Sequence, residues 1–324
     1  SKKRIPSILS RTLAASLVAT AFAACSGTET PQALLAKAES AVQTNDLKAA
    51  EIHLKNLLQQ QDDNAQARFM LAELYRQVND VRSAEKEYRR ARELNYDRNK
   101  VVPPLLEVKL RLGDLAGVIE ESRNLPLSDA DAQARALTVV GLAQLRQGKA
   151  DAARKTLADA LAAKPDYVPA QVAAAAVTAR SDRPAARRAV DQILARQPDS
   201  VEALSLKADL ELADGKLKEG RELLRKVTGA SPFDIEALAK LVTIDLDLQD
   251  LDAAKTDHEA LRKLAPGSPV THYLRASLEA RQNNLSVARE AVQEALRLAP
   301  DYLPAVALAA GLNLSLNSLE QAER

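Results

Sequence analysis

Few residues of this chain could carry out acid–base or metal chemistry, and they are scattered. The 324 residues include three histidines, one cysteine and two Asp-x-Asp triplets. His258 and His272 fall at packing positions of two predicted helices that should be adjacent, so a two-histidine metal site is conceivable. No third ligand stands near them in the sequence, and the favoured interpretation is that both histidines fill packing positions. We therefore expect no metal centre.

The two Asp-x-Asp triplets have the spacing of the metal-holding pair of glycosyltransferases, where the pair lies at a strand end. Asp129 and Asp131 lie instead at a predicted junction between repeats. Asp245 and Asp247 lie inside a predicted helix, on which residues i and i+2 do not face the same way. Neither triplet is therefore expected to bind a metal.

Motifs for covalent catalysis and for nucleotide binding are absent from the sequence. It contains no G-x-S-x-G motif and no G-x-G-x-x-G or G-x-x-x-x-G-K-S/T loop. Lys and Arg (45) nearly balance Asp and Glu (44), which gives a net charge of +1, whereas nucleic-acid binding needs a concentrated basic surface. We expect a protein that is not an enzyme, with no cofactor, no small-molecule substrate and no nucleic-acid partner.

The elements that position these residues are expected to be helices. Hydrophobic residues make up 46% of the chain and charged residues 27%, as in a folded protein. Aromatic residues make up only 3%, with no Trp. A core built from Ala, Leu and Val favours close-packed helices over a sheet.

The first 24 residues have the pattern of a secretory signal peptide. Lys2, Lys3, Arg4 and Arg11 give a positive start, and an apolar run follows over residues 13–24. This run is short for a membrane span, which needs about 20 residues. A basic start and a short apolar core are typical of a signal peptide that is removed.

The only cysteine stands where a bacterial lipoprotein signal would place it. The run ends Phe22-Ala23-Ala24-Cys25, which resembles the lipobox, although Phe22 replaces the usual Leu. The resemblance implies that Cys25 is lipidated and becomes the N-terminus, with residues 25–30 as a tether. Ser26 in place of Asp favours the outer membrane. The alternative is an ordinary cleavage site. We expect a lipid-anchored protein on the periplasmic side of a bacterial cell envelope.

The rest of the chain repeats with a period near 34 residues. Prolines recur at steps of 33, 34, 34 and 34, and small residues recur on the same period. The prolines are Pro165, Pro198, Pro232, Pro266 and Pro300, and the small residues are Ala50, Ala84, Val118, Ala153, Ala186, Gly220, Ala254, Ala288 and Ala322. Such a period is typical of helical hairpins that stack into a solenoid.

Each repeat is predicted to be one hairpin, with a first helix (helix A) and a second helix (helix B). Gly or Asn ends helix A, the small residue lets helix B approach helix A, and Pro ends helix B. The eight hairpins start near residues 31, 65, 99, 134, 167, 201, 235 and 269, and a ninth starts near 303. In the third, Pro103-Pro104 should interrupt helix A and Leu125-Pro126 should shorten helix B.

This pattern resembles the tetratricopeptide repeat family over nearly all of residues 31–324. The resemblance implies an all-α, right-handed superhelical solenoid of about eight to nine repeats, which we interpret as the N-terminal part of a longer array. Residues 272–276 (HYLRA), 288–291 (AREA) and 296–304 (LRLAPDYLP) are also similar to repeats of PrsT-type lipoproteins of the PEP-CTERM/exosortase system. That narrower resemblance implies a role in exopolysaccharide assembly or export, or in PEP-CTERM protein sorting.

The family's binding groove is lined by the second, fifth, ninth and twelfth places of helix A. Phe69 and Tyr273 could anchor a peptide there, and the alternative is that each packs between repeats. The carboxylate clamp that binds chaperone tails is missing, because Phe69 and Glu73 stand where Lys and Asn are needed. The residues carried over as candidates are Gln66, Phe69, Glu73, Arg76, Lys100, Pro103, Glu107, Leu110, Glu202, Ser205, Asp209, Leu212, Val270, Tyr273, Ser277 and Ala280.

Three functions remain open on the sequence alone. The first is a lipid-anchored scaffold that binds protein partners of an envelope export system. The second is the substrate-presenting part of an enzyme whose catalytic domain lies beyond residue 324. The third, a direct carbohydrate-binding module, is disfavoured by an aromatic content of 3%.

Overall fold

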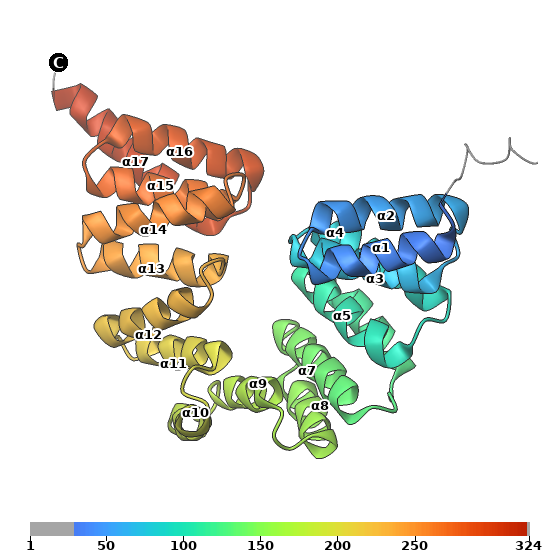
Figure 1. Cartoon of the computed structure of the whole chain (residues 1–324). Helices are drawn as coiled ribbons and strands as arrows, with labels where there is room; N and C mark the ends of the chain where they lie inside the picture. The colour runs from blue at the N-terminus through green and yellow to red at the C-terminus, as the bar shows by residue number, and fades with distance from the viewer. Residues whose placement is uncertain (1–28, 323–324) are drawn as a thin grey trace, which may run out of the picture. The chain divides into compact units, whose positions relative to one another are not determined.

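The computed structural model describes residues 29–322, in which every regular element is a helix (Figure 1). The helices of the first four hairpins are α1 (Pro31–Gln43), α2 (Leu47–Gln60), α3 (Ala65–Gln77), α4 (Val81–Glu93), α5 (Arg98–Arg111), α6 (Leu115–Glu121), a short 3₁₀-helix η1 (Ser122–Asn124), α7 (Ala130–Arg146) and α8 (Ala150–Ala163). The others are α9 (Val168–Thr178), α10 (Arg183–Arg196), α11 (Val201–Ala213), α12 (Leu217–Ala230), α13 (Ile235–Asp247), α14 (Leu251–Leu264), α15 (Pro269–Arg281), α16 (Leu285–Leu298) and α17 (Leu303–Ala322).

Consecutive helices pack as hairpins, so that odd-numbered helices are helix A and even-numbered helices are helix B. α1 packs on α2, α3 on α4 and α7 on α8, and the pairing continues from α9 with α10 to α15 with α16. In the first unit α2 contacts α3, and from α6 to α17 each helix B contacts the next helix A, as α8 contacts α9 and α12 contacts α13. The predicted all-α repeat solenoid is therefore confirmed. No hairpin could bury its apolar face alone, and its neighbours cover that face.

The chain divides into two compact units, residues 1–101 and 102–324. The boundary falls inside α5. The first unit contains α1–α4 and the start of α5, and the second contains the remaining helices.

The turns inside the hairpins use the residues that the repeat pattern predicted. Asn45, Asn79, Gly113, Gly148 and Gly215 all have positive φ, between 57° and 79°. Gly and Asn tolerate this left-handed backbone at the end of a helix at the lowest cost. In several hairpins an aspartate follows the positive-φ residue, and helix B starts at the residue after it. The aspartate carboxylate accepts a hydrogen bond from a backbone N–H in the first turn of helix B.

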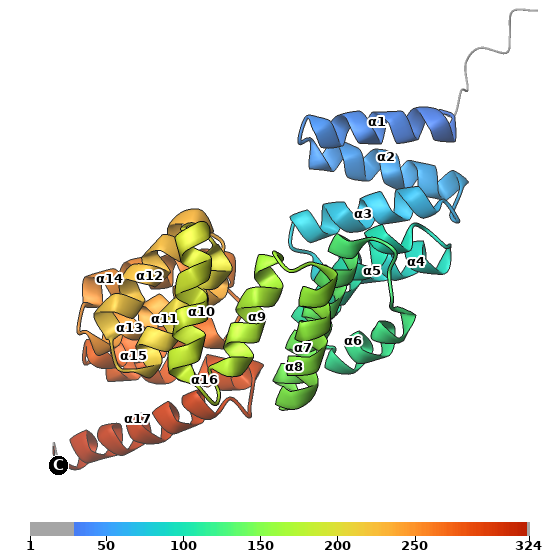
Figure 2. The same cartoon turned by 90° about the horizontal axis from the view of Figure 1, so that it is seen from below.

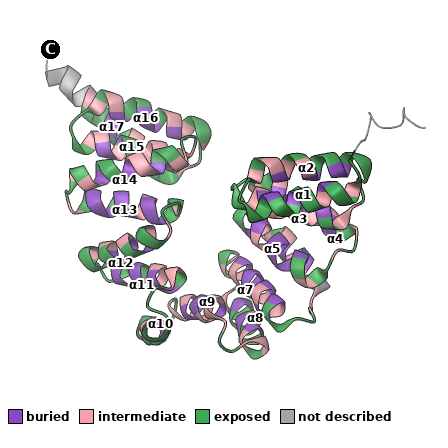
Figure 3. Ribbon diagram, viewed as in Figure 1, coloured by how far each residue is buried: buried purple, intermediate pink, exposed green. Residues whose placement is uncertain are grey.

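The small residue of each helix B lies at the centre of its hairpin. Ala50, Ala84, Ala153 and Ala186 are fully buried, as are Ala254 and Ala288. At the corresponding place Gly220 has no Cβ, and a methyl group added there would come within 2.4 Å of Leu212 Cδ2. Figure 3 shows that the buried residues lie where the helices face one another. Close approach of helix A and helix B therefore explains the small-residue period.

The third hairpin departs from the prediction in its helix A. Pro103 and Pro104 do not interrupt α5, which is continuous from Arg98 to Arg111 and includes both prolines. They stand in its second turn, so the helix loses only the two hydrogen bonds that their N–H groups would have made. Burial of Val101, Leu105 and their apolar neighbours compensates. The predicted shortening of helix B is confirmed, since α6 spans only seven residues, Leu115–Glu121.

In the second unit the A helices also contact one another along one face. α7 contacts α9, α9 contacts α11, α13 contacts α15, and α15 contacts α17. Figure 2 shows α7 and α8 side by side with α9 beside them. This helix-A face is where the sequence placed the groove.

Candidate partner-binding surface

The helix-A face of the second unit carries a pocket of about 260 Å³, which we call the tyrosine pocket. Its wall is formed by the ring of Tyr273, from α15, and the ring of Tyr302, from the loop before α17. The two rings meet edge to face, with centroids 5.5 Å apart. The other lining residues are Leu212, Glu236, Ala239, Lys240, Thr243, Ile244, Val270 and Leu274. The predicted candidate Tyr273 thus packs on a neighbouring repeat and also lines an open pocket.

Lys240 lines the tyrosine pocket and forms its charged side together with two carboxylates. Its Nζ lies 2.7 Å from Asp209 Oδ1 and 2.9 Å from Glu236 Oε1. Burial disfavours the charged amine, but the hydrogen bonds to the two carboxylates outweigh burial and raise the pKa of Lys240. The predicted candidate Asp209 therefore fixes Lys240 across two repeats. Because two carboxylates share one amine, this rim keeps a net negative charge.

The first unit carries a second pocket of about 390 Å³, the phenylalanine pocket, lined by Val42, Phe69, Met70, Glu73, Leu74, Arg76 and Gln77. Three of these, Phe69, Glu73 and Arg76, are predicted candidates. The ring of Phe69 stacks on Tyr96 with centroids 4.8 Å apart and an interplanar angle of 22°. Phe69, like Tyr273, packs between repeats and also borders a pocket, so the two interpretations drawn from the sequence are compatible.

Glu73 and Arg76 form a hydrogen-bonded network with the buried Tyr88 of α4. The Tyr88 hydroxyl donates to Glu73, Arg76 Nε donates to the Tyr88 hydroxyl at 3.2 Å, and Arg76 lies 2.6 Å from Glu73 Oε2. Burial first, and then the hydrogen bond to Glu73, raise the pKa of Tyr88 well above its ordinary value. These two candidates are therefore held in place before any partner arrives.

The remaining candidates of the first unit lie at its surface. Gln66 is exposed and donates to Glu39 Oε1 at 3.1 Å, so it links α3 to α1. Lys100 is exposed near the start of α5. Neither residue lines the phenylalanine pocket.

The candidates of α5 and α11 in the second unit have mixed environments. Glu107 makes a two-armed ion pair with Arg135 of α7, with distances of 2.5 and 2.6 Å. Glu202 is exposed at the first turn of α11. Pro103 and Leu110, also expected in the groove, are buried. The four-place rule therefore fails in the third repeat, where the apolar side of α5 has been turned inward.

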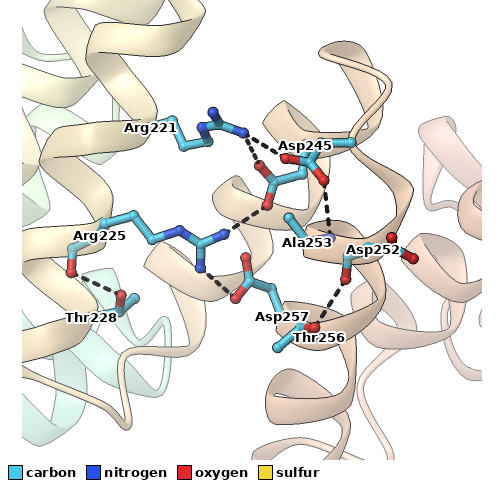
Figure 4. Close-up of polar contacts among 9 residues, drawn as sticks. Arg221, Arg225, Thr228, Asp245, Asp252, Ala253, Thr256 and Asp257 are labelled. Carbon is cyan, nitrogen blue, oxygen red and sulfur yellow. Dashed lines mark hydrogen bonds and ion pairs between the residues drawn. The ribbon is translucent and has the colours of Figure 1, made fainter.

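Sequence reasoning missed a buried charge cluster between the sixth and seventh hairpins (Figure 4). Asp245 of α13 is fully buried, and Arg221 and Arg225 of α12 lie 3.2 and 3.0 Å from its two oxygens. Arg225 also lies 2.7 Å from Asp257 of α14, and Arg221 lies 3.1 Å from Asp250. We call these five residues the joint cluster. Asp245, the first carboxylate of the second Asp-x-Asp triplet, is thus engaged by two arginines inside the fold.

The joint cluster has a signal in the sequence that could have revealed it. Arg187 lies 3.4 Å from Glu211 in the preceding pair of hairpins, and Arg221 contacts Asp245 in the next. Both residues of the second pair lie 34 places after those of the first. An arginine on helix B and a carboxylate on the next helix A therefore recur in register with the repeat.

The other candidate metal residues have structural roles. Asp129 caps α7 by accepting the Ala132 N–H, and Asp131 pairs with Lys164. His258 is buried and its Nε2 lies 3.1 Å from the Thr271 carbonyl oxygen, and burial lowers the pKa of His258. Within residues 29–322 no group of three or more potential ligands is placed to hold a metal ion.

Cys25 and the predicted signal peptide lie outside the described residues. Within the part of the chain that the structure describes, none of the helices is both long and apolar enough to cross a membrane.

Comparison with solved structures finds helical repeat proteins. A tetratricopeptide repeat protein from Parabacteroides merdae is 16% identical, with a TM-score of 0.45 over 87% of this chain and 98% of its own. Yeast Tom70 is 12% identical, with a TM-score of 0.47 over 88% and 74%. The first TPR of Spaghetti, bound to an HSP90 peptide, is 17% identical, with a TM-score of 0.34 over 36% and 93%. No curated protein sequence matches the chain.

The family model described as tetratricopeptide repeat matches residues 35–99, 173–235 and 240–302, together more than half of the chain. The matched segments cover helical hairpins of both units. Repeats of this kind act as scaffolds for protein–protein interaction. The chain belongs to the tetratricopeptide repeat family.

Proposed function

We propose that this protein is a lipid-anchored scaffold of the bacterial cell envelope that holds an extended segment of a protein partner on its helix-A face. The proposal combines the family, which supplies the scaffold role, with the sequence pattern at Cys25, which supplies the anchor. The similarity to PrsT-type repeats makes exopolysaccharide assembly or export, or PEP-CTERM protein sorting, the process in which we expect it to act.

The observation that carries the binding part of the proposal is the tyrosine pocket. Its floor is apolar, its wall is aromatic, and its rim carries the Lys240 ion pairs. Such a site suits an apolar side chain of a partner, with polar contacts at the edge for orientation.

A photo-crosslinking experiment in the native host tests the binding part. A benzophenone amino acid replaces Thr243, which lines the tyrosine pocket, or Lys255, which is exposed on helix B of the same hairpin. We expect a discrete crosslinked partner from position 243 and none from position 255. Equal crosslinking from both positions, or from position 255 alone, would show that the helix-A face is not the binding surface.

The anchor is tested separately by metabolic labelling with radioactive palmitate. Cys25→Ala should abolish incorporation, because no other cysteine exists in the chain. It should also release the protein from the membrane fraction, since stable anchoring depends on the acyl chains. Labelling of the Ala variant at the level of the unaltered protein would exclude Cys25 as the lipid site.

A further inference from the structure

A second pocket of the 102–324 unit lies away from the tyrosine pocket, at the turn between α9 and α10. It has a volume of about 460 Å³ and is lined by Arg180, Arg183, Arg187, Asp214 and three small or apolar residues. We call it the arginine pocket. We infer that the arginine pocket is a second docking point, which binds the carboxylates of an acidic segment of a protein partner.

The lining of the arginine pocket carries an excess of positive charge. Three guanidinium groups and a single carboxylate, that of Asp214, line the pocket. Asp214 pairs with two of the three arginines, at 3.3 Å from Arg183 and 2.9 Å from Arg187. Arg180 has only a long hydrogen bond to a backbone carbonyl, from its NH2 group to Leu145 at 3.4 Å. Its charge is therefore not balanced by a carboxylate in the pocket.

The acidic residues behind the pocket are already engaged. Glu211 lies 3.4 Å from Arg187 and 3.0 Å from Lys216, so it shares its charge between two bases. Asp182 caps α10, where its carboxylate accepts the Ala185 N–H at 2.8 Å. Counting these residues still leaves more bases than acids around the pocket. An incoming carboxylate would therefore meet Arg180, which has no carboxylate partner among the described residues, and Arg183, which shares Asp214 with Arg187.

The next pair of hairpins provides an internal comparison. In the joint cluster two arginines face three carboxylates, and the central carboxylate is fully buried. In the arginine pocket the corresponding arginine, Arg187, is joined by two further arginines and faces open space. The same pair of positions thus carries more carboxylates than arginines in one pair of hairpins, whereas in the other a pocket lined by three arginines and one carboxylate lies beside it.

Charge complementarity decides the occupant. A guanidinium group presents paired N–H donors that match the two oxygens of a carboxylate. Side chains of Arg180 and Arg183 are exposed on the turn, where a chain lying across the surface can reach them. An Asp- or Glu-rich segment supplies several carboxylates at the spacing of neighbouring residues. The inference goes beyond the proposed function, because this site does not involve the helix-A face.

Fluorescence anisotropy with a labelled hexaglutamate peptide and the full chain tests the inference. Arg180→Gln/Arg183→Gln should weaken binding at least about tenfold at moderate ionic strength, because two charge-assisted contacts are lost. The matched control, Arg188→Gln/Arg289→Gln, removes the same charge from two exposed helix-B positions and should change the affinity less than about twofold. Equal losses in the two variants would overturn the inference.

A gain of affinity separates binding from misfolding. Asp214→Asn removes the one lining carboxylate that competes for Arg183 and Arg187, so it should tighten hexaglutamate binding by about threefold or more. Unchanged or weaker binding would count against the site.

Binding of phosphatidylglycerol vesicles without binding of the peptide would overturn the choice of a protein segment. Variants of the tyrosine pocket should leave hexaglutamate binding unchanged, which distinguishes failure here from failure of the proposed function.

Discussion

Asp245→Asn is the substitution that best reveals how the joint cluster is balanced. Arg221 and Arg225 favour the ionised carboxylate, whereas full burial and the facing Asp257 favour the protonated form. Burial, followed by the hydrogen bond that protonated Asp245 donates to Asp257, prevails and raises the pKa of Asp245 from 3.8 to about 6. Asp257 Oδ2 is buried without a hydrogen-bond donor, and a proton shared between the two carboxyl groups would supply one.

The sign and size of the effect follow from this pKa. Because the folded state binds the proton more tightly than the unfolded state, ionised Asp245 costs stability above about pH 6, and this cost disappears as the pH falls toward 4. The full difference corresponds to roughly 3 kcal/mol at about 1.4 kcal/mol for each pH unit, as an upper bound. Between pH 7 and pH 5 the gain in the free energy of unfolding should be about 1 kcal/mol.

The assay is urea unfolding of the full chain and of the Asn variant at several pH values between 5 and 7. Burial lowers the pKa of His258, so protonation of this residue in acid destabilises the folded state, an effect of the opposite sign. Subtracting the free energy of unfolding of the variant from that of the unaltered protein at each pH removes the contribution of His258. This difference in the free energy of unfolding should rise by about 1 kcal/mol between pH 7 and pH 5. A difference that falls would show that the arginines, and not burial, control Asp245.

Three further substitutions test the packing. Tyr88→Phe removes the hydroxyl that donates to Glu73, and it should cost about 1–2 kcal/mol in urea unfolding because a hydrogen bond to a charged, partly buried carboxylate is lost. No change would mean that water replaces the hydroxyl. Gly141→Ala would place a methyl 2.7 Å from the buried Leu157 Cγ, and thermal unfolding should show a loss of about 1–3 kcal/mol despite the better helix propensity of Ala. In Gly148→Ala the added methyl meets no atom within 4 Å, but the residue must keep its φ of +79°. Thermal unfolding should therefore show a loss of stability of about 1 kcal/mol that comes from the backbone alone. A stabilised variant would refute that reasoning.

The sequence was sufficient for the hairpins because each hairpin is specified by local chemistry. The turn at Gly148 needs a positive φ, and the close approach at Ala153 needs a small side chain. Both requirements recur with the period, so eight weak local signals support one another. The stacking of neighbours then follows, since each isolated hairpin would leave an apolar face exposed.

The errors arose where a residue's role depends on what covers it. Pro103 and Pro104 are helix breakers by local rule, yet α5 continues through them because its flanks are buried. Phe69 and Tyr273 could be placed on helix A from the period alone. Their partners, Tyr96 and Tyr302, belong to the loops that follow the next helix, which positional counting along helix A does not include.

The two pairs of linked arginines and carboxylates show how the repeat period places charged residues that can serve either the fold or a partner. In two successive pairs of stacked hairpins, an arginine on helix B meets a carboxylate on the next helix A. What surrounds the pair decides its role. Around Asp245 two further carboxylates, Asp250 and Asp257, balance the arginines, whereas around Arg187 two further arginines line a pocket with an excess of positive charge. A few substitutions on an unchanged backbone can therefore convert a structural joint into a surface for a partner, without altering the helix-A face.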